Sequence, residues 1–111
     1  MEKVILVFVK LKKDIDRSAF EAFEEKVAKY NITLSSHKSF KVLRTIGVLG
    51  NETLESPYDY IEIIDIVSLE SMYQTVEKDG KIKAFIEEFQ QFAEKSQFLI
   101  TEYLVSVASL P

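Results

Sequence analysis

Apolar and polar positions follow two different periods along the chain, and each change of period marks a new element. Residues 4–11 are apolar at nearly every position and four of them are β-branched, which is typical of a central strand covered on both faces. Between Phe20 and Tyr30, apolar side chains recur every three or four residues and predict one face of a helix. Ser18 and Glu21 have the spacing of a capping box, so we expect this helix to begin near Ser18.

The rest of the chain predicts, in order, two strands, two helices and a last strand, at residues 40–49, 58–67, 69–77, 81–95 and 98–107. A polar loop rich in turn-forming residues joins the two consecutive strands, so we expect a hairpin there. The order β-α-β-β-α-β predicts an α+β fold, the ferredoxin-like sandwich, in which the helices cover one face of a four-stranded antiparallel sheet. The length of 111 residues, with no linker or repeat, predicts a single domain over residues 1–111.

The predicted third strand, within the stretch SPYDYIEIIDI, carries phenols and carboxylates among its isoleucines. Side chains alternate between the two faces of a strand. One face therefore holds Ile61 and Ile63, and the other holds Tyr58, Tyr60 and Glu62. We assign the two isoleucines to the helix side and the tyrosines and Glu62 to the outer face of the sheet.

The outer face assigned in this way is too apolar to be left in water. It would also include Ile64, together with Val42, Arg44 and Ile46 from the second strand. Apolar patches of this size normally mark an interface. A second copy of the chain would cover the patch and close a barrel between two sheets, so we expect a two-fold homodimer.

Composition excludes several classes of partner and site. The net charge is -4 and Lys and Glu are interspersed, so no nucleic-acid partner is expected. No apolar run approaches the roughly 20 residues that span a bilayer, so we expect no membrane insertion and a cytoplasmic protein. The chain has no cysteine, one histidine and no glycine-rich phosphate loop, and we expect neither a metal nor a cofactor.

The segment PYDYIEIIDI resembles RedY-like, HapK-like proteins, with SFKVLRTIGVLG before it and FIEEFQQFAEKSQFLITEYL after it. The resemblance covers about residues 4–104, although the segment around His37, LSSHKSF, departs from the family's pattern. Proteins of this kind are small dimeric α/β barrels associated with the biosynthesis of prodigiosin-type pigments. The resemblance therefore implies a ferredoxin-like fold, a dimer and a role in secondary metabolism.

Three side chains are candidates for proton transfer: Tyr60, Glu62 and His37. Desolvation in a half-buried barrel would raise the pKa of Glu62 towards the range of a general base, whereas an ion pair with Arg44 would favour the charged form. His37 has an unperturbed pKa near neutrality and precedes the second strand, where it either overhangs a cleft or is an exposed loop residue.

Four further residues are candidates for ligand binding: Tyr58, Arg44, Phe89 and Tyr103. The phenols would hydrogen-bond a polar ligand atom or simply reach water at the barrel mouth. Phe89 belongs to a phenylalanine stripe that is expected to be core, with one edge that walls a cleft between helix and sheet.

Three functions remain open at this point. In the first, the chain binds a flat, mostly apolar heteroaromatic intermediate of a prodigiosin-type pathway and promotes its condensation or cyclisation by acid–base catalysis. In the second, it is a cofactor-free monooxygenase or a polyketide-cyclase-like enzyme in which His37 is indispensable. In the third, it is a non-catalytic, ligand-binding accessory dimer. Whether the chain is an enzyme is left open.

Overall fold

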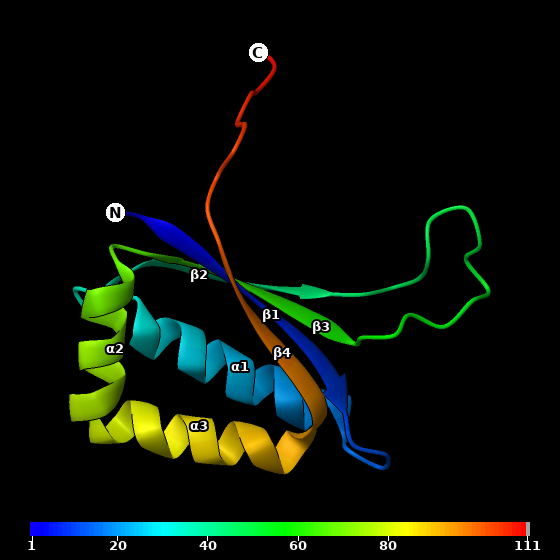
Figure 1. Cartoon of the computed structure of the whole chain (residues 1–111). Helices are drawn as coiled ribbons and strands as arrows, with labels where there is room; N and C mark the ends of the chain where they lie inside the picture. Colours follow the sequence, from blue (N-terminus) through cyan, green and yellow to red (C-terminus); the bar gives the residue numbers. More distant parts are fainter. Residues whose placement is uncertain (111) are drawn as a thin grey trace.

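The computed structural model describes residues 1–110 as an antiparallel four-stranded sheet with helices packed on one face (Figure 1). The elements run β1 (Lys3–Leu11), α1 (Arg17–Asn31), β2 (His37–Arg44), β3 (Tyr60–Ile66), α2 (Leu69–Lys78), α3 (Gly80–Phe92) and β4 (Ala93–Thr101). The strand order in the sheet is β2-β3-β1-β4. This is the ferredoxin-like arrangement, with its second helical segment divided into α2 and α3.

Strand β1 is the most buried strand of the sheet, as its sequence predicted. It pairs with β3 on one side and β4 on the other, so both of its edges are hydrogen-bonded. Its helix-side residues Ile5, Val7, Val9 and Leu11 belong to the hydrophobic core, and Val4 is buried on the other face. Cover by the helices on one face and pairing at both edges explain most of the apolar run, whereas Leu6 and Phe8 on the outer face are only partly buried.

Helix α1 begins two residues earlier than the capping-box spacing predicts. Asp16 is the N-cap, and its carboxylate accepts a hydrogen bond from the backbone N–H of Ser18 at 3.0 Å. The predicted apolar stripe is confirmed, because Phe20, Phe23 and Val27 are all buried against the sheet and α3. Ser18 is thus a first-turn residue rather than the cap.

Asp79 separates α2 from α3. Its backbone N–H closes the last turn of α2 on Thr75, and its carboxylate accepts from the N–H of Ile82 at 2.9 Å, which caps α3. Helix α2 itself begins after Ser68, which accepts from the N–H of Ser71. One aspartate therefore turns the chain between the two helices.

Strand β4 lies about six residues earlier than its sequence predicts. It covers residues 93–101 instead of 98–107, and α3 accordingly ends at Phe92 instead of near Lys95. The register with β1 sets these limits, because Val4 faces Thr101 and the pairing between β1 and β4 ends there. Residues 102–110 form an extended arm that leaves the body of the protein, with Leu104 and Val107 almost fully exposed (Figure 1).

Strand β2 is also shorter than expected and ends at Arg44 instead of Leu49. Residues 45–59 then form a long loop that projects away from the sheet (Figure 1). Ile46 and Leu49, which the sequence assigned to the strand, are nearly fully exposed on this loop.

The two faces of β3 are the reverse of our assignment. Tyr60, Glu62 and Ile64 point to the helix side, and Ile61 and Ile63 lie on the outer face. On β2, Phe40, Val42 and Arg44 likewise face the helices. The assignment failed because it gave the more apolar residue pair to the core, whereas the helix side of β3 borders a cavity and tolerates polar groups.

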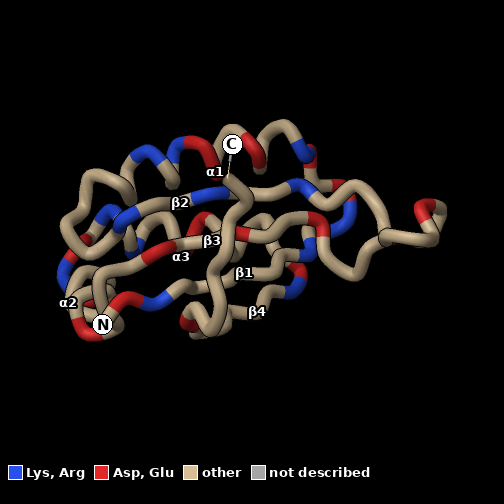
Figure 2. The backbone as a smooth tube through the Cα atoms, turned by 90° about the horizontal axis from the view of Figure 1, so that it is seen from above, with Lys and Arg blue, Asp and Glu red and all other residues tan. Residues whose placement is uncertain are grey.

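The outer face of the sheet is apolar and only partly covered. Its inner positions are Leu6, Phe8, Leu43, Ile61, Ile63 and Leu99, and none of them is fully buried. Lys41 of the edge strand β2, which pairs with Ile63, also lies on this face, and other charged residues are distributed along the helices, loops and strands (Figure 2). Among residues 1–110, no helix is long and apolar enough to cross a membrane.

Candidate functional site

A cavity of about 350 Å³ lies between the helix side of the sheet and the three helices. All four strands contribute apolar side chains to its wall, namely Ile5, Phe40, Ile64, Phe98 and Ile100. Phe23 and Val27 of α1, Met72 and Val76 of α2, and Ile82, Phe85 and Phe89 of α3 complete the apolar lining. Phe98 and Ile100 are more than half exposed, so the cavity opens beside β4.

Two carboxyl groups, Glu24 and Glu62, interrupt this apolar wall. Glu24 comes from α1 and is 2% exposed, and Glu62 comes from the centre of β3 and is 5% exposed. No N–H or O–H group among the described residues donates a hydrogen bond to either oxygen of Glu24. Buried carboxyl groups without donors are rare and costly, which makes this pair the most unusual feature of the cavity.

The surroundings of the pair favour a bound proton. Burial raises the pKa of Glu62 well above its usual value of 4.5, and a hydrogen bond with Glu24 and its charge raise it further. Burial also raises the pKa of Glu24. Two close carboxyl groups in an apolar wall cannot both ionise at low cost, so the pair favours retaining a proton, and a protonated Glu62 would offer Glu24 a donor.

His37 is the third polar group of chemical interest in the wall of the cavity. Its Nδ1 lies 2.9 Å from Oγ of Ser36, which is itself 2.8 Å from the hydroxyl of Thr75 on α2. Burial lowers the pKa of His37, so the imidazole is neutral near pH 7. The structure thus places His37 in the cavity rather than on an exposed loop.

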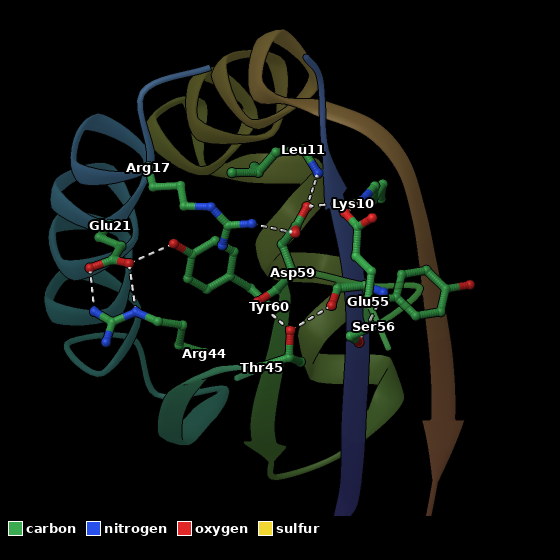
Figure 3. Close-up of polar contacts among 11 residues, drawn as sticks. Lys10, Leu11, Arg17, Glu21, Arg44, Thr45, Glu55, Ser56, Asp59 and Tyr60 are labelled. Atoms are coloured by element: carbon green, nitrogen blue, oxygen red, sulfur yellow. Dashed lines mark hydrogen bonds and ion pairs between the residues drawn. The ribbon is translucent and has the colours of Figure 1, made fainter. Parts of the chain in front are cut away.

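Tyr60 and Arg44 lie in a neighbouring, more polar hollow of about 230 Å³. The hydroxyl of Tyr60 donates to Glu21 of α1 at 2.5 Å, and Arg44 binds the same carboxylate through two nitrogens at 2.6 and 2.9 Å (Figure 3). Arg44 and then Tyr60 lower the pKa of Glu21 to about 2. Arg44 therefore pairs with Glu21 and not with Glu62, which overturns the ion pair considered from the sequence.

Asp59 organises the end of the sheet next to this hollow. Its carboxylate accepts from the backbone N–H of Leu11 at 2.8 Å and from Arg17 at 2.7 Å (Figure 3). The Arg17 guanidinium also lies 5.8 Å from the ring centre of Tyr60. These contacts fix the start of α1 against β1 and β3, and so position Glu21 and Glu24 on the following turns.

The other two candidates, Tyr58 and Tyr103, are outside the cavity. Tyr58 packs against Phe8 on the outer face, and its hydroxyl donates to Gln97 at 3.0 Å. Tyr103 lies in the exposed C-terminal arm, with its hydroxyl 3.5 Å from Asp65. The structure therefore brings Glu62, His37 and Phe89 together in one cavity. Tyr60 and Arg44 line the adjoining hollow, and Tyr58 and Tyr103 line neither.

Glu24 was missed by the sequence reasoning, although a signal was present. Position 24 lies four residues after Phe20 and three before Val27, on the same face of α1 as the apolar stripe.

Among residues 1–110, no group of three His, Asp or Glu side chains is placed to hold a metal ion. The carboxyl groups of Glu24 and Glu62 and the imidazole of His37 offer proton transfer and hydrogen bonding.

Solved structures of several other proteins are similar to this chain over nearly its whole length. HapK from Hahella chejuensis is 24% identical, with a TM-score of 0.72 over 100% of both chains. SnoaB, a cofactor-independent oxygenase from Streptomyces nogalater, is 9% identical, with a TM-score of 0.77 over 97% of this chain and 98% of that one. A dimeric ferredoxin-like protein from Thermobifida fusca is 10% identical, with a TM-score of 0.72 over 93% of this chain and 92% of that one. At these identities the structural likeness shows a shared fold.

No curated protein matches the chain significantly. The sequence pattern of the family described as REDY-like protein HapK, in contrast, matches residues 3–104, which is nearly the whole chain. The chain therefore belongs to the REDY-like HapK family.

Proposed function

We propose that the protein binds a flat, mostly apolar heteroaromatic intermediate of prodigiosin-type pigment biosynthesis and promotes its condensation or cyclisation by acid–base catalysis. The observation that carries this proposal is the cavity of about 350 Å³, whose apolar wall holds the buried carboxyl group of Glu62. The volume lies at the lower end of the range of small-molecule sites, which suits a ligand of two or three fused or linked rings.

Glu62 is the proton donor and acceptor in this proposal. A carboxyl group with a raised pKa holds a proton near neutral pH and can release it to an electrophilic carbonyl or imine, which then accepts attack by a ring carbon. The neutral imidazole of His37, in the same wall, is the base that removes the proton from the attacking ring carbon. The imidazolium returns this proton to the new hydroxyl or amino group, which leaves as water or amine. Phe89 and its neighbours supply apolar contacts to the ring faces.

Binding can be tested with a bipyrrole carbaldehyde as the probe. Val76→Phe places a larger side chain in the cavity wall, whereas Val67→Phe makes the same change outside it. We expect the first substitution to weaken binding about tenfold or more and the second to leave it unchanged. Equal affinities for the two variants would place the ligand elsewhere and contradict the proposal.

Turnover can be tested by adding a monopyrrole to the bipyrrole carbaldehyde and following pigment formation by absorbance. Glu62→Gln should lower the rate by about 10²–10⁴, the usual contribution of a positioned acid or base. A wild-type protein that binds the aldehyde but does not accelerate the reaction would instead support the non-catalytic accessory role. The place in the pathway can be tested by expressing this chain in a pigment-producing strain that lacks its own HapK protein. Restored pigment would support the proposed role.

A cofactor-free monooxygenase or polyketide-cyclase-like activity is the second candidate. One observation favours it: His37 lies in the wall of the same cavity, with one ring nitrogen held by Ser36. Oxygen uptake in the presence of anthrone tests this activity. In this reading His37→Ala abolishes uptake and Glu62→Gln preserves it, whereas in the first candidate Glu62→Gln also lowers the rate of turnover.

The same proposal includes a homodimer formed through the outer face of the sheet. Support comes from the apolar, partly exposed side chains of that face, from the exposed apolar arm of residues 102–110, and from the Thermobifida fusca structure, which is described as dimeric. A second copy covers the outer face and leaves the helix-side cavity of each protomer open. The expected cytoplasmic location stays a prediction, and cell fractionation would test it.

A further inference from the structure

The carboxyl groups of Glu24 and Glu62 lack a cationic partner on the protein. The wall of the cavity contains neither Lys nor Arg. The two nearby arginines are already paired, Arg44 with Glu21 and Arg17 with Asp59. The other ionisable groups of the cavity wall are His37 and Tyr73, and those of the adjoining hollow are Glu21, Glu25, Arg44 and Tyr60.

One shared proton does not satisfy such a pair. Two carboxyl groups that hold a single proton still carry one negative charge and at least two acceptor oxygens without donors. An unpaired charge in an apolar wall costs several kcal/mol, and the same surroundings strengthen any hydrogen bond made to it. The two oxygens of Glu24 that accept no hydrogen bond are therefore suited to a hydrogen-bond donor on the ligand.

We infer that the Glu24–Glu62 pair recognises a positively charged nitrogen, so that the ligand is a flat ring system with a protonated ring nitrogen, amine or amidine. This inference rests on the proposed function and narrows its ligand class. A cationic N–H group donates a charge-assisted hydrogen bond and also neutralises the pair, whereas a neutral N–H group does only the first. Phe23, Phe85 and Phe89 line the same cavity, and a ring face presented by any of them would also favour a cation over a neutral ring.

Benzamidine and benzamide provide a matched test, because they have nearly the same shape and only the former is a cation at neutral pH. Binding of each probe to the whole protein is measured by calorimetry and by chemical-shift changes of the cavity residues. We expect benzamidine to bind about tenfold or more tightly than benzamide. Glu24→Gln and Glu62→Gln should each reduce this ratio to near one.

Glu25→Gln is the control, because Glu25 is the exposed neighbour of Glu24 on α1 and pairs with Lys29. It should leave the preference for benzamidine unchanged. Loss of the preference in Glu25→Gln to the same extent as in Glu24→Gln would indicate surface binding and overturn the inference. Glu24→Gln and Glu62→Gln keep the size of the side chain and remove a buried acidic group, so both variants are expected to fold. Circular dichroism verifies the fold of each variant.

The outcomes separate this inference from the proposed function. If benzamide binds as well as benzamidine, or if the bipyrrole carbaldehyde binds in the cavity and benzamidine does not, the charge preference is wrong and the apolar ligand site stands. If the bipyrrole carbaldehyde and both benzene probes fail to bind, the ligand site and the inference built on it are both rejected.

Discussion

The two faces of the sheet differ in a way that hydrophobicity alone does not predict. The helix side is covered by three helices, yet it carries Glu62 and Tyr60 on β3 and faces Glu24 from α1. The outer face has no helix over it, yet its central positions are isoleucine, leucine and phenylalanine. The covered face holds the core but tolerates a few polar groups where it borders a cavity. The uncovered face is apolar because, in our proposal, a second copy covers it.

The largest effect on stability is expected from a comparison of two phenylalanines that lie on opposite sides of the sheet. Phe20 is fully buried and its ring lies near those of Phe23, Tyr60, Phe89 and Phe92. Phe20→Ala should lower the free energy of unfolding by about 3–5 kcal/mol in urea denaturation, as for other buried phenylalanines. Phe8→Ala on the outer face should cost less in dilute protein, with a loss that grows as the protein concentration is raised. A loss below about 1 kcal/mol for Phe20→Ala would show that the helix side is not the main core.

The next effect tests the cover of the outer face. Ile61 pairs with Phe8 and Leu43 at the centre of that face, so Ile61→Asp would bury an unpaired charge in the proposed dimer at a cost of several kcal/mol. Light scattering should change from twice 12.8 kDa in the wild type to 12.8 kDa in the variant. Val67→Asp, at an exposed position beyond β3, serves as the control and should stay dimeric. A monomeric wild type at micromolar concentration would remove the explanation for the apolar outer face.

A smaller effect tests the buried acids through pH. The pKa of Glu62 in the folded protein is raised above its unfolded value near 4.5, so its stabilising contribution is complete below about pH 4.5 and declines as the pH rises through the folded pKa. Glu62→Gln should therefore gain stability relative to the wild type at pH 8, by about 1–3 kcal/mol, and lose that advantage at pH 4.5. His37, whose pKa is lowered, works in the opposite direction in both proteins, so the difference between their pH profiles reports the Glu24–Glu62 pair. Parallel profiles would contradict a raised pKa.

The smallest expected effect separates the second hollow from the cavity. Tyr60→Phe removes the hydrogen bond to Glu21 but keeps the buried ring, so stability should fall by no more than about 1 kcal/mol. Because Tyr60 does not line the main cavity, the affinity for the bipyrrole carbaldehyde should not change. An affinity loss of tenfold or more would place Tyr60 in the ligand site and join the two hollows into one.

The sequence predicted the order of the elements well, because β1 and α1 carry strong local patterns. The limits of β4 were not predictable in the same way, because they depend on its register with a strand more than eighty residues earlier in the chain. The candidate site was found only in part. Glu62, His37 and Phe89 do line one cavity, but Glu24 resembles an ordinary surface glutamate in the run FEEK, and only its helical position relative to Phe20 indicates burial.

The position of β1 at the centre of the sheet has a consequence for how the chain folds. Val4 pairs with Asp65 on one side and with Thr101 on the other. Both strands that neighbour β1 are therefore far from it in the sequence. Contacts with such large sequence separation require long loops to close, which slows folding. During synthesis β1 leaves the ribosome long before β4, and the edge of β1 that pairs with β4 stays open until this last strand arrives. Refolding yields should therefore depend on protein concentration, because an unpaired β1 is the segment of this chain most prone to pair with another molecule.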